Sequence, residues 1–208
     1  MKKRIALIIS VMLLFGVTGC MRSNSPASVE DLPDNYSQEY PTPLEELPDD
    51  YSLEQAKEDG CVTHEDGNVT QGKEIFEAFF RRTASGKAAQ VRLADYYTLG
   101  DPSGYDPEYY ESVKDDYPCL YIQDLSFDGE KYTIRWYEDG EEIIRNYSCL
   151  MKYEGPAESR DAIYQSYIRY VLTNDDSVTW QELIYGLTSS QLGDYIDHKS
   201  VCTEYIYE

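Results

Sequence analysis

The chain alternates between two hydrophobic periods, and each period predicts a different kind of element. A period near 3.6 predicts a helix from about Gln71 to Ser85, with Thr70 as N-cap and an apolar face of Ile75, Phe76, Phe79 and Phe80. From residue 88 the period changes to two, which is typical of strands. The middle of the chain is therefore expected to be a sheet that follows a helix.

Two Asp-Gly pairs divide the centre of the chain into strand-like runs. Runs 118–127, 130–138 and 141–152 are separated by Asp128-Gly129 and Asp139-Gly140. A two-residue Asp-Gly connection favours a type I′ hairpin turn. The turns predict an antiparallel meander that pairs Leu125 with Tyr132 and Trp136 with Ile143. Its buried face would then carry Tyr121, Leu125, Tyr132, Ile134, Trp136, Ile143 and Tyr147.

Shorter signals flank the meander. Ser52 with Gln55 and Thr179 with Glu182 have the spacing of capping boxes, which predicts a helix after each pair. Apolar residues at helical spacing predict a further helix over 159–173, and strands are expected at 61–65, 88–98 and 201–207. The predicted fold class is α+β: an antiparallel β-meander of about four to five strands, with a long helix packed on one face and additional C-terminal helices.

The N-terminus has the features of an export signal. Lys2, Lys3 and Arg4 precede 13 uncharged residues from Ile5 to Val17. This apolar run is too short to span a membrane, which needs about 20 residues, but it suits a signal peptide. Val17-Thr18-Gly19-Cys20 resembles the lipobox of bacterial lipoproteins. That resemblance implies removal of residues 1–19 and lipidation of Cys20, which would anchor the chain to the outer face of the cell membrane.

A tether and a single domain are predicted after the signal. Residues 20–51 are rich in Pro, Ser and acids, and too poor in large apolar residues to form a core. Asp31–Ser37 is repeated with small changes as Glu46–Ser52. The repeat could be a pair of docking peptides or a duplicated spacer. Residues 52–208 have a suitable length for one globular domain.

Charge narrows the range of partners. The chain has 18 Lys and Arg against 39 Asp and Glu, a net charge of −21, and removal of residues 1–19 would make it −24. Such a surface argues against nucleic acid, whose phosphates need a basic footprint. The acidic charge is consistent with a surface that is simply solvated, or with one that binds cationic partners or divalent metals.

Four cysteines besides Cys20 could form disulfides in an exported protein. They are Cys61, Cys119, Cys149 and Cys202. The meander register places Cys119 and Cys149 at opposite ends, roughly 27 Å apart along the strands, so a bond between them is disfavoured. If two bonds form, Cys149 joins Cys61 or Cys202.

The candidate binding residues lie in an acidic, Tyr-rich loop after the first long strand. They are Asp101, Tyr105, Asp106, Glu108, Tyr109 and Tyr110. Carboxylates beside aromatic rings suit sugars or peptides, and the oxygens could bind calcium, although the spacing is not that of an EF-hand. The two histidines, His64 and His198, lie in no nucleophile motif. We therefore predict no catalytic residues, no metal site and no cofactor.

One internal segment resembles a known family. Val91 to Pro102, followed by the Asp-Gly meander, is similar to an uncharacterised family of small lipoproteins of Gram-positive bacteria, a domain of unknown function. The similarity covers about residues 60–155. It implies an exported lipoprotein and assigns no active site.

These patterns predict a surface-displayed lipoprotein that acts as a non-enzymatic binding or protein-interaction module. Its partners would be the membrane, through Cys20, and a protein or glycan ligand. One alternative is a cell-wall or glycan hydrolase that uses acidic residues near 101–111. The other is an inhibitor or immunity-type protein that binds a basic enzyme.

Overall fold

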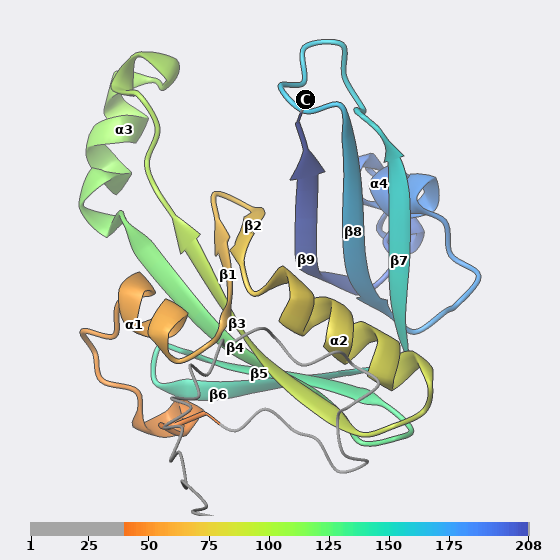
Figure 1. The fold of residues 1–208 in the computed structure, drawn as a ribbon. Helices are drawn as coiled ribbons and strands as arrows, with labels where there is room; N and C mark the ends of the chain where they lie inside the picture. The colour runs from red at the N-terminus through yellow and green to blue at the C-terminus, as the bar shows by residue number, and fades with distance from the viewer. Residues whose placement is uncertain (1–39, 208) are drawn as a thin grey trace, which may run out of the picture.

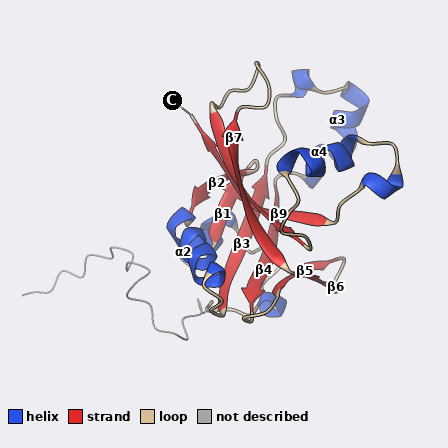
Figure 2. Ribbon diagram, turned by 90° about the vertical axis from the view of Figure 1, so that its right-hand side faces the viewer, coloured by secondary structure: helices blue, strands red, loops and turns tan. Residues whose placement is uncertain are grey.

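A computed structural model describes residues 40–207 (Figure 1). The predicted signal peptide, Cys20 and the first part of the tether lie outside the described residues. The described chain forms a six-stranded mixed sheet, ordered β2-β1-β3-β4-β5-β6, and a three-stranded antiparallel sheet, ordered β7-β8-β9. Figures 1 and 2 show the second sheet standing across one face of the first.

The larger sheet and its helices come from the first two thirds of the chain. Its strands are β1 (Val62–Glu65), β2 (Asn68–Gln71), β3 (Ala89–Tyr97), β4 (Cys119–Phe127), β5 (Tyr132–Glu138) and β6 (Glu141–Tyr147). The helices of this part are α1 (Leu53–Glu58), α2 (Lys73–Ala84) and α3 (Pro107–Val113). The rest of the chain supplies β7 (Cys149–Pro156), β8 (Ser166–Thr173), α4 (Trp180–Thr188) and β9 (His198–Ile206).

The predicted fold class is wrong, because the described structure is mostly β. It has nine strands in two sheets and four short helices, rather than a long helix on a meander. The clearest error is the helix predicted over 159–173, where the chain forms the strand β8. Residues from Arg169 to Thr173 are buried on both faces of this strand. A run buried on both faces has no period of two, and periodicity does not distinguish it from a helix.

The meander is present, with one turn as predicted and one wider. Trp136 pairs with Ile143 and Tyr132 with Tyr147, as a two-residue turn at Asp139-Gly140 requires. At the other turn Leu125 pairs with Ile134 instead of Tyr132. The Asp128 carboxylate accepts the backbone N–H groups of Glu130 and Lys131 and so opens the loop to four residues. The third predicted run is split at Ser148, and its halves enter different sheets.

The core lies between the two sheets and under α2. Phe76 and Phe79 of α2 reach Leu93 and Leu125 of the larger sheet, and Leu172 of β8 joins the same cluster. The predicted apolar helix face is thus buried, although α2 has 12 residues and starts after Gly72 rather than Thr70. The second sheet covers the part of this face of the larger sheet that α2 leaves uncovered.

Residues 40–51, predicted as the end of the tether, pack on the opposite face of the larger sheet. The Tyr40 hydroxyl accepts the Arg92 backbone N–H at 2.5 Å, and Leu44 is buried. We call residues 40–51 the N-terminal strap. Beneath it, the Arg92 guanidinium binds the buried Asp124 carboxylate through two hydrogen bonds of 2.7 and 3.0 Å. The strap leads into α1 through the predicted capping box of Ser52 and Gln55, which is confirmed.

Candidate functional site

Three polar side chains interrupt the apolar inner face of the larger sheet. On β3 the inward positions run Val91, Leu93 and then Asp95, since side chains alternate along a strand. Parallel pairing places His64 of β1 beside Asp95, and antiparallel pairing places Gln123 of β4 beside Leu93. The face that forms the core at one end therefore becomes polar at the other.

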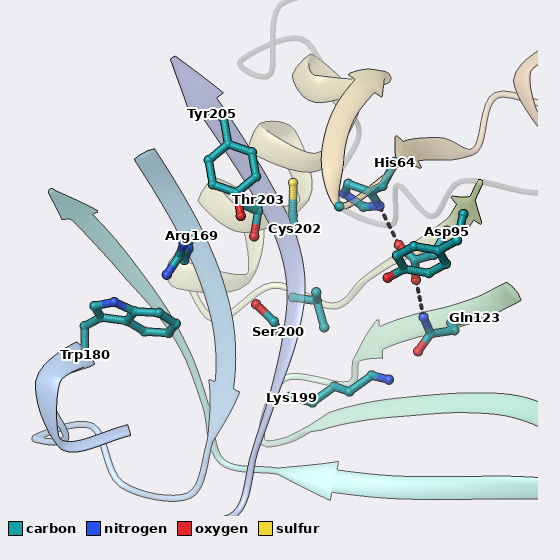
Figure 3. Close-up of a pocket in the computed structure, with 13 residues that line it drawn as sticks. His64, Asp95, Gln123, Arg169, Trp180, Lys199, Ser200, Cys202, Thr203 and Tyr205 are labelled. Carbon is teal, nitrogen blue, oxygen red and sulfur yellow. Dashed lines mark hydrogen bonds and ion pairs between the residues drawn. The ribbon is translucent and has the colours of Figure 1, made fainter. Parts of the chain in front are cut away.

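Asp95 connects the other two residues (Figure 3). Its Oδ1 lies 2.8 Å from His64 Nδ1, and its Oδ2 accepts a hydrogen bond of 2.5 Å from Gln123 Nε2. His64 is 3% exposed and Gln123 is 6% exposed. The contact with His64 is short but its direction departs from that of an ideal hydrogen bond, because Nδ1 does not meet the geometry of one. Both carboxylate oxygens are nonetheless engaged inside the protein.

The arrangement leaves two buried atoms without a partner. No described residue hydrogen-bonds to His64 Nε2 or to Gln123 Oε1. Because the Asp95 carboxylate can only accept hydrogen bonds, it determines which atoms of His64 and Gln123 are donors and which are acceptors. It turns the Gln123 amide nitrogen toward itself, and it faces Nδ1 of the His64 ring, so that a ring with a single proton carries it on Nδ1. Nε2 and Oε1 are then both acceptors.

These residues line a cleft between the sheets, which we call the inter-sheet cleft. It consists of two adjoining hollows of about 320 and 240 Å³ that share Asp95, Tyr97, Gln123 and Lys199. Their combined size is that of a site for a small molecule. The larger hollow is also lined by His64, Gly67, Arg169, Trp180, Ser200, Val201, Cys202, Thr203 and Tyr205, and the smaller by Tyr121 and Trp136.

Lys199 of β9 supplies a positive charge to both hollows. Its ammonium lies 4.9 Å from the centre of the Trp136 ring, and its side chain makes no ion pair with any described residue. Burial lowers the pKa of Lys199, and the Asp95 carboxylate opposes this by raising that pKa. A half-buried ammonium without a counter-ion is unusual in a folded protein.

Aromatic side chains form both ends of the cleft. Tyr97 and Tyr121 meet edge to face at 6.1 Å and are 38% and 54% exposed, so their rings are accessible to a ligand. At the far end the Arg169 guanidinium lies 4.4 Å from the Trp180 ring and donates two hydrogen bonds to Glu158, of 3.2 and 3.0 Å. Arg169 is therefore held by the protein itself, unlike Lys199.

The loop predicted as the binding site lies elsewhere. Figure 1 shows it as a projecting lobe around α3. Its acids cap local backbone: Asp101 accepts the Ser103 N–H, and Asp106 accepts the N–H groups of Glu108 and Tyr109. Tyr105 packs against Tyr109 and Tyr110, with ring centres 6.2 and 5.9 Å apart. None of these six residues lines the inter-sheet cleft.

Two further observations limit the chemistry of the predicted loop. The hydrogen bonds from the Ser103 hydroxyl and backbone lower the pKa of Asp101, whereas a general acid needs a raised pKa. Within residues 40–207, no group of three or more His, Cys, Asp or Glu side chains is placed to hold a metal ion. No helix in the same range has the length and hydrophobicity needed to cross a membrane.

The four described cysteines are free thiols in the structure. Cys61 and Cys202 are buried, and Cys119 and Cys149 are partly exposed. Burial raises the pKa of Cys202, which lines the cleft, so its thiol stays protonated and is a poor nucleophile.

The sequence reasoning missed His64, Asp95, Gln123 and Lys199. The available signal was the period of two in 88–98, in which Asp95 occupies an inward position after Val91 and Leu93. No protein-family model, curated protein or solved structure matches this chain. The site must therefore be interpreted from its geometry.

Proposed function

We propose that this chain is a lipoprotein, anchored through Cys20 to the outer face of a bacterial membrane, that binds a saccharide in the inter-sheet cleft. The observation that carries the proposal is the pair of buried, unpartnered acceptors, His64 Nε2 and Gln123 Oε1. Buried polar atoms are almost always hydrogen-bonded, by protein, water or ligand. Both atoms are covered in this structure, so donation from neighbouring sugar hydroxyl groups requires the two side chains to turn toward the cleft.

The aromatic rings supply the second half of such a site. Tyr97, Tyr121 and Trp136 lie beside the polar residues, in the smaller hollow. Sugars have apolar C–H faces, and aromatic side chains combine a large apolar surface with a fixed geometry. A few placed polar groups among aromatic side chains are typical of small-molecule sites.

Binding fits the cleft better than glycan hydrolysis does. Glycosidases of the usual kind need two carboxyl groups on either side of the scissile bond. Among the described residues that line the cleft, Asp95 is the one acid, and His64 and Gln123 engage both of its oxygens. An imidazole next to a carboxylate could serve as a general base, but no hydroxyl or thiol among residues 40–207 hydrogen-bonds to Nε2.

Intrinsic fluorescence provides a direct test of binding. The chain has two tryptophans, Trp136 and Trp180, and each lines one hollow of the cleft. Titration with a panel of cell-wall saccharides should give a saturable change in emission. Gln123→Leu should weaken that response at least tenfold, whereas Gln181→Leu, outside the cleft, should not. A wild-type chain that responds to no saccharide would contradict the proposal.

The anchor is tested separately. Cells that express the full chain should incorporate labelled palmitate into it and retain it in the membrane fraction. Cys20→Ala should abolish the label. Labelling that persists in this variant would place the lipid on another residue.

A further inference from the structure

We infer that the saccharide bound in the inter-sheet cleft carries a carboxylate, as a uronic acid does, and that the Lys199 ammonium receives it. This inference rests on the proposed function and specifies its ligand class.

Lys199 has no counter-ion among the described residues. Its half-buried side chain extends from β9 into the cleft, where Figure 3 shows its nitrogen directed toward Gln123 without an interaction to the His64–Asp95–Gln123 group. The Trp136 ring, 4.9 Å from the ammonium, offers attraction but no negative charge. Removing an ammonium from water without pairing it is costly, so the site favours an anion from outside.

Asp95 does not fill this role, although it lines the same hollows. Its oxygens are taken at 2.8 Å by His64 and at 2.5 Å by Gln123. Arg169, the other cation of the cleft, is bound by Glu158. Lys199 is thus the one Lys or Arg lining the cleft that makes no ion pair with a described residue, although the Asp95 and Glu138 carboxylates act on it at longer range. This is a local exception in a chain with a net charge of −21.

The remaining groups exclude a simple carboxylate as the ligand. Acetate would pair with Lys199 but has no donor for His64 Nε2 or Gln123 Oε1. A neutral sugar would satisfy those two acceptors and leave the ammonium without an anion. An acidic sugar carries hydroxyl donors, a carboxylate and an apolar face for Tyr97 and Tyr121.

The test uses the full-length chain in detergent, titrated with oligogalacturonates, with neutral galacto-oligosaccharides of the same length and with acetate. We expect the acidic oligomer to bind about ten- to a hundredfold more tightly than the neutral one, as for a hydrogen bond to a charged group. Lys199→Gln should remove this preference, so that the acidic and neutral oligomers bind alike, whereas Lys199→Arg should retain most of it. Lys152→Gln, on β7 outside the cleft, is the matched control and should change neither.

Each outcome has a distinct meaning. Equal binding of acidic and neutral oligomers would overturn the inference and leave the proposed function intact. Binding of neither would overturn both. Acetate that binds as tightly as the acidic oligomer would show that the hydroxyl acceptors are not used. If a Lys199→Gln variant that circular dichroism and thermal melting show to be folded still prefers the acidic oligomer, the ligand carboxylate does not bind at Lys199, which would overturn the inference.

Discussion

His64 Nδ1 lies 2.8 Å from Asp95 Oδ1 because β1 and β3 run parallel and pair these two residues directly. These two residues are 31 positions apart in sequence, and α2 lies between them in the chain. The short contact therefore depends on the tertiary fold, and on Asp95 facing inward. Its consequence for the site can be tested by changing the charge of Asp95 alone.

Asp95→Asn should change the group that Gln123 presents to the cleft from a hydrogen-bond acceptor to a donor. An asparagine amide presents one oxygen and one NH₂ group, so retaining the His64 contact turns the NH₂ group toward Gln123. The Gln123 amide must then rotate and present its own NH₂ group to the cleft. We expect saccharide affinity to fall about ten- to a hundredfold, which corresponds to one to two hydrogen bonds. Titration by tryptophan fluorescence measures the change.

A loss of folding would imitate this result, so thermal melting of Asp95→Asn is needed beside the titration. Asp101→Asn is the matched control, since its carboxylate caps an exposed turn outside the cleft. The proposed role of Asp95 would be refuted by a folded Asp95→Asn variant with wild-type affinity.

The parts of the fold that were predicted correctly depend on local chemistry. The capping boxes at Ser52 and Thr179 and the two-residue turn at Asp139-Gly140 involve residues within three positions of each other. The helix predicted over 159–173 was wrong because Arg169 to Thr173 are buried on both faces of β8, which removes the alternation that marks a strand.

The inter-sheet cleft depends on long-range pairing and was not predictable in the same way. Asp95, Gln123 and Lys199 come from β3, β4 and β9, and no local spacing indicates that they meet. The carboxylates and tyrosines of the acidic loop cluster in sequence, which is typical of a binding site, but Asp101 and Asp106 cap the turn and α3. Sequence clustering there reflects local folding.

Asp124→Ala should strongly destabilise the protein. The Arg92 and Asp124 side chains are 2% and 4% exposed, and removal of the carboxylate leaves a buried guanidinium without its partner. We expect a loss of about 3–5 kcal/mol in the free energy of unfolding. Urea denaturation measures it. Glu142→Ala removes an exposed partner of Arg135 and should cost less than about 1 kcal/mol. Equal losses in both variants would contradict the role of the buried pair.

The N-terminal strap should contribute to stability through Tyr40. Tyr40→Phe removes the hydroxyl that accepts the Arg92 backbone N–H, which leaves a buried donor unpaired. The expected cost is about 1–3 kcal/mol, and Tyr40→Ala should cost more because the ring also packs on the Arg92 guanidinium at 4.6 Å. Tyr207→Phe is an exposed control, expected within about 0.5 kcal/mol of wild type. If Tyr40→Ala unfolds like wild type, residues 40–51 do not stabilise the domain.

Thiol reactivity should separate the four cysteines into two classes. Cys119 and Cys149 are partly exposed and should react first with Ellman's reagent, while the buried Cys61 and Cys202 should react only as the protein opens. Four thiols per chain, not counting Cys20, are expected in urea without reductant. A smaller number would show that some of them have formed disulfides.

Alkaline pH should destabilise the protein through Cys61. Its side chain is fully buried, and burial raises the pKa of the thiol from 9.0 to about 11. Between these values the unfolded chain has lost a proton that the folded chain still holds, so the free energy of unfolding falls as pH rises. Two pKa units correspond to about 2–3 kcal/mol for this residue. Burial also raises the pKa of Tyr170, from 10.0 to about 12, which extends the same effect to higher pH.

Urea denaturation at pH 8, 9, 10 and 11 measures how the free energy of unfolding depends on pH, and Cys61→Ala isolates the contribution of Cys61. The variant is expected to be less stable than wild type at pH 8, because it loses buried sulfur contacts. Its decline between pH 9 and 11 should nevertheless be shallower by about 2–3 kcal/mol. Lys199 acts in the opposite direction, since burial lowers its pKa and favours its neutral form in the folded chain. Parallel declines in the wild type and Cys61→Ala would show that the Cys61 thiol ionises as readily in the folded protein as in the unfolded chain.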